Sequence, residues 1–204
     1  MSERHGETVL KRTKTAVKKI ADTARPKKQP AVTERPGSWH LARTETERRL
    51  TDFEFGLERL AQAYYRWKAA CLAAVCDVPL TGDDVAVLNV VRMGDEPKRL
   101  SEIGQLLNRV DVPNLQYATR KLVRAGLIET EGSSSRKETR YRATATGHSV
   151  TEAYAALRAA TLPPMLEALD GWAAKSEMTS SHLDLISSLY AQAAQVAITR
   201  RHQP

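Results

Sequence analysis

The sequence predicts a mainly α protein with a small β-wing, and three observations support this fold class. Apolar residues recur every three or four positions over 44–76, 81–125 and 147–200, which is the period of an amphipathic helix. Strict alternation, typical of a half-exposed strand, is confined to a short stretch near residue 140. The 204 residues are 42% hydrophobic and 27% charged, a composition typical of a globular chain with its own core.

A helix-turn-helix is predicted from residue 100 onward. The first helix, 100–107, has one apolar face, and Ser101 is the expected N-cap. Residues 108–111 break the pattern, and Asp111 is expected to cap the second helix. Pro113 fits that helix's first turn, where its missing N–H costs no helical hydrogen bond.

The second helix, 112–125, has two different sides. One side is apolar and is expected to be buried: Leu115, Ala118, Leu122 and Ala125. The opposite side is polar, basic and aromatic: Pro113, Gln116, Tyr117, Arg120 and Arg124. Glutamine and arginine side chains pair with base edges, and arginine also contacts phosphates, so this side suits the major groove of DNA.

A basic hairpin follows the second helix. The strands are expected at 127–131 and 139–143, joined by a Gly- and Ser-containing loop. Four cations load this hairpin: Arg136, Lys137, Arg140 and Arg142. A solvated hairpin beside an ordinary amphipathic helix is the simpler interpretation. The order of basic helix and basic wing instead favours a winged helix-turn-helix that binds DNA.

Three motifs in this region resemble those of the MarR family of bacterial winged-helix transcription regulators. They are 100–103 (LSEI), 121–129 (KLVRAGLIE) and 144–147 (TATG). At the wing the family usually has Asp-Arg-Arg, whereas this chain has Ser135-Arg136-Lys137. The resemblance implies a homodimeric repressor on a pseudo-palindromic operator. It also implies release by a small aromatic or anionic ligand, bound between the dimerisation helices and the DNA-binding lobe.

The residues predicted to contact DNA are polar or basic positions around the helix-turn-helix and the wing. They are Lys98, Arg99, Ser101, Pro113, Asn114, Gln116, Tyr117, Arg120, Lys121, Arg124, Arg136, Lys137 and Arg140. Lys98 and Arg99 directly precede the first motif helix and are expected at phosphates. Gln116, Tyr117 and Arg120 are the best candidates for base edges.

The helical segments on either side are predicted to dimerise. Residues 44–76 carry a heptad-like apolar repeat, which suits either a partner helix or burial within one monomer. Residues 147–200 continue as helix, with a kink or a break expected at Pro163 and Pro164. The predicted body is thus 37–204, with the winged helix-turn-helix at 81–144.

Most of the net charge of +7 belongs to the N-terminus. Residues 1–36 hold 10 Lys and Arg against 4 Asp and Glu, with few large apolar residues, so a disordered tail is predicted. The tail is either a phosphate-binding arm or a dispensable extension. If binding relied on it alone, the protein would be a non-specific architectural DNA binder. A protein-interaction scaffold without DNA is disfavoured by the cations of 120–124.

The sequence contains no Walker loop, Gly-rich dinucleotide turn, HExxH motif or paired CxxC motif. No catalytic site, metal site or cofactor is therefore expected. Tyr64, Trp67 and Cys71 could line a ligand pocket, although a role in the core is the stronger interpretation. Cys71 and Cys76 are five apart and project differently from a helix, yet a redox-responsive regulator acting through Cys71 remains an alternative. With no apolar run long enough to span a bilayer and no signal peptide, the expected location is the cytoplasm, at the nucleoid.

Overall fold

The structure is a computed structural model that describes residues 40–132 and 139–200. These residues fall into two compact units, one ending at Ala159 and the other beginning at Ala160. The predicted tail 1–36 and the wing residues Arg136 and Lys137 lie outside the described residues.

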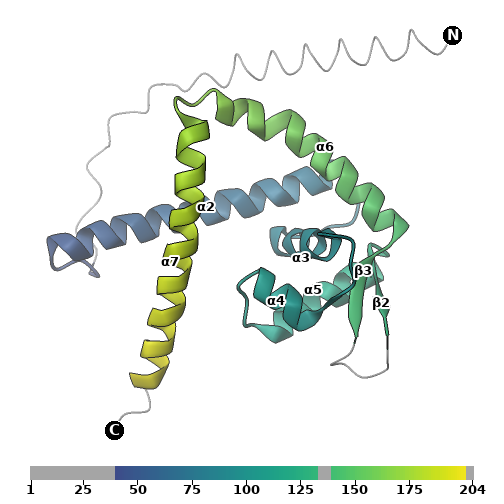
Figure 1. The fold of residues 1–204 in the computed structure, drawn as a ribbon, viewed down its shortest axis with the longest axis horizontal. Coiled ribbons are helices and arrows are strands. Elements are labelled where there is room, and N and C mark those ends of the chain that lie inside the picture. The colour runs from purple at the N-terminus through teal and green to yellow at the C-terminus, as the bar shows by residue number, and fades with distance from the viewer. Residues whose placement is uncertain (1–39, 133–138, 201–204) are drawn as a thin grey trace. The chain divides into compact units, whose positions relative to one another are not determined.

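The observed elements match the predicted fold class: helices with one small antiparallel sheet (Figure 1). In chain order they are α2 (Glu45–Ala73), α3 (Gly82–Arg92), β1 (Lys98–Arg99), α4 (Leu100–Leu106), α5 (Val112–Arg124), β2 (Ile128–Glu131), β3 (Arg140–Ala143), α6 (Ala145–Glu167) and α7 (Trp172–Arg200). None of the described helices is long and apolar enough to cross a membrane.

Both α2 and α3 begin with a capping box, in which a threonine side chain and an acidic side chain exchange hydrogen bonds with backbone N–H groups. Thr44 and Glu47 form the box of α2. Thr81 and Asp84 form the box of α3, so this helix begins at Gly82.

The prediction that Ser101 caps α4 is wrong. The helix begins at Leu100, and Arg99 occupies the N-cap position, where its backbone N–H donates to Glu102 Oε2 at 2.7 Å. Ser101 therefore lies inside the first turn and is exposed. Glu102 replaces the hydroxyl cap because its carboxylate reaches back one turn.

The sheet has the strand order β1-β3-β2, and both pairs are antiparallel. β1 has only two residues, Lys98 and Arg99, which pair with Tyr141 and Arg140, and the sequence pattern did not predict it. Because side chains alternate across a strand, Tyr141 turns toward the core while Arg140 and Arg142 share the other face.

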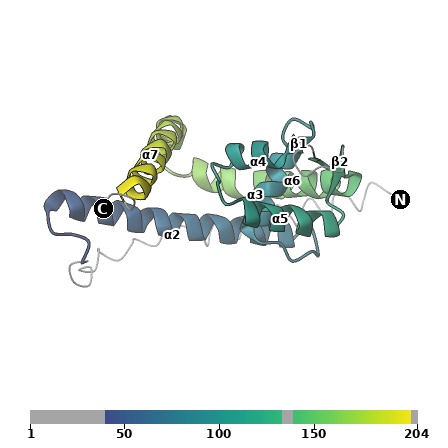
Figure 2. The ribbon, with the colours of Figure 1, turned by 90° about the horizontal axis from the view of Figure 1, so that it is seen from below.

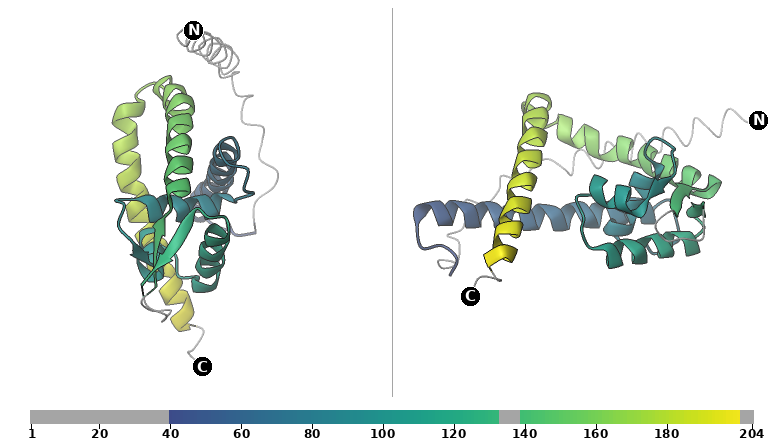
Figure 3. Two further views of the ribbon diagram at one scale, coloured as in Figure 1. Left: turned by 90° about the vertical axis from the view of Figure 1, so that its right-hand side faces the viewer. Right: turned by 60° about the horizontal axis from the view of Figure 1, so that its bottom comes forward.

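One apolar core connects the sheet, α3, α4 and α5 with the C-terminal half of α2 and the start of α6. Its members are buried residues from all these elements, including Leu72, Leu88, Ile103, Leu115, Leu122, Leu127, Ile128 and Tyr154. The winged helix lies around the C-terminal half of α2, while the N-terminal half extends away from it (Figures 2 and 3). The core thus fixes α5 relative to α2.

The TATG motif connects the wing to α6. The Thr144 hydroxyl donates to Gly126 O at 2.6 Å and accepts from the Gly147 N–H at 3.0 Å. Gly147 is buried, and a Cβ there would lie 1.9 Å from the Leu127 carbonyl oxygen. The motif therefore allows α6 to start in close contact with the α5–β2 turn.

The sequence predicted a kink or a break at Pro163 and Pro164, and a break does not occur. α6 continues through both prolines to Glu167, although each lacks the N–H that an interior helical hydrogen bond needs. The turn comes later, where Gly171 adopts φ +70° and α7 starts at Trp172. No residue of α7 is buried.

Candidate nucleic-acid interface

The two-sided character predicted for α5 is confirmed. Leu115, Ala118, Thr119 and Leu122 are buried against the core. Pro113, Tyr117, Arg120 and Arg124 are exposed on the other side, and Gln116 is half-buried. Ala125 is only half-buried and follows the end of the helix, whereas Thr119 is fully buried, with its hydroxyl donating to Gln116 O at 3.1 Å.

The outward side of α5 is cationic and not neutralised by its own neighbours. Neither Arg120 nor Arg124 has an acidic partner within 40–132 and 139–200. Tyr117, on the same side, is 63% exposed. Guanidinium groups that lack a protein partner remain available for phosphate oxygens or for the acceptors of a guanine edge.

The turn before α5 is held by a salt bridge that the sequence analysis missed. Arg109 donates from Nε and Nη2 to both carboxylate oxygens of Asp111, at 2.8 and 2.6 Å. These bonds hold the pKa of the Asp111 carboxyl well below its usual range and raise the pKa of Arg109. Arg109 Nη1 also lies 3.5 Å from Asp83 Oδ1 at the start of α3. The turn is therefore tied to the scaffold.

Asp111 occupies the predicted N-cap position of α5, but its carboxylate makes no cap bond to the helix. It accepts instead from Arg109 and from Asn114 Nδ2, at 3.0 Å. Asn114, a predicted DNA contact, thus has one amide N–H engaged within the protein. The Arg-x-Asp spacing at 109–111 is the sequence signal that could have indicated this pair.

Lys121 lies on α5 but binds within the protein. Its ammonium is 2.7 Å from Asp84 Oδ2, and Asp84 is buried in the capping box of α3. Burial alone would raise the pKa of Asp84, but hydrogen bonds from Lys121 and Thr81 outweigh it and hold this pKa below its ordinary value. The structure gives Lys121 a role in joining α5 to α3.

Lys98 also has its ammonium within the protein. It donates to the backbone oxygens of Met93 and Glu96, the latter at 3.0 Å, and approaches Val91 O at 3.5 Å. A cation at the end of α3 interacts favourably with the helix dipole. Arg99, the next residue, is exposed beside Arg140 on β3.

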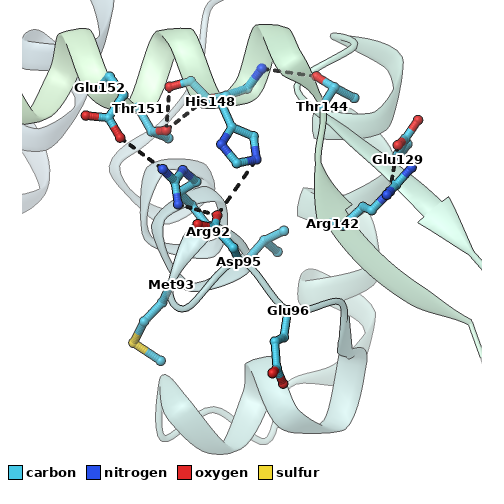
Figure 4. A network of polar contacts seen from close by, with 12 residues as sticks. Arg92, Met93, Asp95, Glu96, Glu129, Arg142, Thr144, His148, Thr151 and Glu152 are labelled. Atoms are coloured by element: carbon cyan, nitrogen blue, oxygen red, sulfur yellow. Dashed lines mark hydrogen bonds and ion pairs between the residues drawn. The ribbon is translucent and has the colours of Figure 1, made fainter.

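In the described part of the wing, charges are partly compensated. Arg142 Nε donates to Glu129 Oε1 on β2 at 2.7 Å, and Arg140 Nη1 donates to Pro97 O at 3.2 Å. Figure 4 shows the first pair at the edge of the hairpin. Arg140 retains further N–H groups, so one structural bond does not exclude contact with DNA.

A second polar network joins the end of α3 to α6 (Figure 4). Arg92 pairs with Asp95 and donates from Nη2 to Glu152 Oε1 at 2.9 Å. His148 Nε2 lies 3.8 Å from Asp95 Oδ1. These exposed contacts link α6 to the α3–β1 turn, and no outward residue of α5 takes part in them.

The three predicted pocket residues lie on one helix, α2. Tyr64 and Trp67 stack with ring centroids 6.4 Å apart, while Cys71 is buried in the core. Burial raises the pKa of the Cys71 thiol, the opposite of what a reactive thiolate needs. Lys68, which the sequence analysis missed, is buried with its ammonium 4.6 and 4.3 Å from the ring centroids of Tyr64 and Tyr65.

Residues 80–147 match a family model described as "Winged helix DNA-binding domain". This part of the chain is therefore similar to a winged helix DNA-binding domain, in agreement with the predicted fold class. The match is to a DNA-binding family rather than an enzyme family, in agreement with the expectation that the chain is not an enzyme. Among curated proteins, none matches this chain in sequence.

Solved structures with a similar fold include transcription regulators, one of them of the MarR family. AbfR of Staphylococcus epidermidis superposes with a TM-score of 0.58 at 15% identity, over 74% of this chain and 99% of that one. Sco5413, a MarR family transcriptional regulator from Streptomyces coelicolor, gives 0.53 at 20% identity, over 72% and 96%. The M. tuberculosis regulator MosR, solved in complex with DNA, gives 0.53 at 15%, over 70% and 96%. The predicted resemblance to the MarR family is thus confirmed in the fold.

Proposed function

We propose that this chain is a sequence-specific transcription regulator that binds a pseudo-palindromic operator as a homodimer. The outward side of α5 carries this proposal, because it combines exposed Arg120, Arg124 and Tyr117 with Gln116 on a helix held by the core. Arginine and glutamine are the side chains that pair bidentately with guanine and adenine in the major groove. The relatives solved with DNA, such as MosR, support DNA as the partner.

Apolar side chains that are exposed to solvent in a single chain support the homodimer. The N-terminal half of α2 exposes Leu50, Phe53, Leu57 and Leu60, each by at least 36%. α7 exposes Met178, Leu183, Leu185, Leu189 and Val196. Contiguous exposed apolar surface of this kind marks a protein–protein interface. Two copies would present two α5 helices about one helical turn of DNA apart.

The proposed regulation is repression released by a small aromatic or anionic ligand. The stacked pair of Tyr64 and Trp67, with the Lys68 ammonium against the Tyr64 ring, supports this ligand class. An aromatic ring would extend the stack, and an anion would be attracted by the lysine. Tyr65, next to them in the chain, packs against Gly82 at the start of α3, so movement of α2 would reach the winged helix. A regulator of this kind acts in the cytoplasm, at the chromosome.

The experiment that tests the proposal is selection of DNA from a random pool by the full chain at near-physiological salt. We expect an inverted repeat with half-sites about one helical turn apart. Arg120→Ala should lose about tenfold or more on the selected site and much less on random DNA. Recovery of no site above background would overturn the proposed function.

A second experiment tests whether α5 reads the base sequence while the wing binds phosphates. Arg136→Ala, in the predicted wing tip, should weaken specific and random DNA binding alike, because phosphate contacts carry no sequence information. Equal losses on both DNAs for Arg120→Ala and for Arg136→Ala would show that α5 does not specify the site.

A further inference from the structure

The start of α5 presents two valines that the core does not use. Val110 is 94% exposed and Val112, the first residue of the helix, is 50% exposed. Single exposed apolar residues are normal on a protein surface. These two, however, lie at the end of the helix that would enter the groove first, since the N-terminal residues of a recognition helix contact base edges.

The backbone holds Val112 in one place. Its N–H donates to Val110 O at 3.0 Å, and Asp111 between them has φ −82° and ψ 69°, the geometry of an inverse γ-turn. The Arg109–Asp111 salt bridge and the Asn114 hydrogen bond brace the same turn. A β-branched side chain in a helix has one strongly preferred rotamer. Val112 therefore loses little freedom when it meets a partner.

The neighbour of Val112 on α5 is Gln116, one turn later on the same side. Side chains four residues apart have Cβ atoms about 5–6 Å apart, so both can cover one base pair or two adjacent ones. Glutamine pairs bidentately with the N6 and N7 of adenine. The C5-methyl group of thymine, which projects into the same groove, is the apolar feature a valine can contact.

We propose that Val112 packs against the C5-methyl group of a thymine beside the base contacted by Gln116, and so specifies thymine at that position of each half-site. The proposal rests on the proposed function and deepens it. DNA rather than another protein is the occupant, because exposed Arg120 and Arg124 continue the same outward side of α5. Their positive charge matches phosphates.

The test removes the methyl group alone. In the operator selected by the full chain, each thymine of the half-site is replaced in turn by 2′-deoxyuridine. At one position we expect the wild-type Kd to rise about fourfold per half-site, the fold-change for exposing one buried methyl group. Val112→Ala should bind the thymine and deoxyuridine operators with equal Kd.

Val123→Ala is the matched control. Val123 lies three turns later on the same side of α5 and is 37% exposed, so it resembles Val112 in type and environment but not in position. This variant should keep the full discrimination against deoxyuridine. If no position discriminates in the wild type, or if Val112→Ala discriminates as well as the wild type, the role of Val112 is overturned while the proposed function stands. Failure to select any operator would overturn both.

Discussion

Two lysines show that the partner of a charged residue, rather than its charge, decides its role. Lys98 and Lys121 both stand among basic residues that suit phosphates. In the structure the Lys98 ammonium caps the end of α3 and the Lys121 ammonium binds buried Asp84. Arg120 and Arg124, which have no acidic partner in the described part of the chain, stay available for the proposed contacts with DNA.

Lys121→Met should lower stability without changing how binding depends on salt. Removing the ammonium leaves the buried Asp84 carboxylate with its bonds from Thr81 but without its cation. This should cost about 2 kcal/mol of unfolding free energy, since the lysine end of the pair is partly exposed. Urea denaturation at matched protein concentration measures this loss. Arg124→Met, on the exposed side of α5, should cost less than about 0.5 kcal/mol.

The salt dependence of DNA binding then separates the two roles. Each phosphate contact contributes about −0.9 to the slope of log Kobs against log salt. Lys121→Met should keep the wild-type slope, whereas Arg124→Met should make it shallower. A shallower slope for Lys121→Met would show that its ammonium reaches phosphate after all.

At the scale of elements, periodicity predicted α5 well and local caps poorly. The outward and buried sides of α5 follow from the spacing of residues such as Leu115 and Arg120, because a helix fixes their directions. The cap at Ser101 was misassigned, because the Glu102 carboxylate bonds to the N–H of Arg99 instead. Asp111 does stand at the N-cap of α5, but its carboxylate binds Arg109, a partner that only the folded turn brings close. β1 is too short to leave a pattern in the sequence, since Arg99 and Lys98 alone form it.

The candidate DNA-binding site was also predictable only in part: the direction of its side chains could be predicted, but their partners within the protein could not. The exposure of Arg120 and Tyr117 follows from the helix period, but the salt bridge of Lys121 to buried Asp84 does not. Its partner Asp84 lies 37 residues earlier, and only the packing of α3 against α5 joins them. The spacing of Thr81 and Asp84 indicates a capping box in the sequence, but it does not indicate that Lys121 also binds Asp84.

Gly147→Ala should loosen the junction between the wing and α6. The added Cβ would lie 1.9 Å from the Leu127 carbonyl oxygen, so the backbone must shift, at a cost of about 3 kcal/mol. Gly56→Ala is the matched control, because nothing lies within 4 Å of its Cβ position in the middle of α2. It should raise the unfolding free energy by about 0.5–1 kcal/mol, as alanine favours a helix over glycine. Thermal unfolding compares the two, and equal effects would contradict the close packing of Gly147.

At the scale of the whole molecule, exposed apolar surface on α7 predicts that assembly and DNA binding depend on each other. Leu189→Glu places a charge on the apolar side of α7, where Leu189 is 54% exposed in one chain. Burying that charge in a dimer is costly, so we expect a monomer in analytical ultracentrifugation. A monomer holds only one half-site, and the operator Kd should rise at least tenfold. Gln195→Glu, on the polar side of the same helix, should remain dimeric and bind normally.

Deletion of the N-terminal tail separates sequence preference for DNA from overall affinity for DNA. Residues 1–36 carry a net charge of +6, while the remaining 168 residues carry only +1. Deleting 1–36 removes up to ten cations that can displace counterions from DNA, so the slope of log Kobs against log salt should become shallower. The ratio of operator to random-DNA affinity should stay within about threefold of the full chain, because phosphate contacts by the tail strengthen both alike.

Binding curves at four or more salt concentrations, on operator and on random DNA, measure the slope and the ratio together. If the ratio falls to one after deletion, the tail and not α5 carries the binding, and the architectural alternative is correct. If slope and ratio are both unchanged, the tail is a dispensable extension, and the outward arginines of α5, with the wing, account for the electrostatic part of binding.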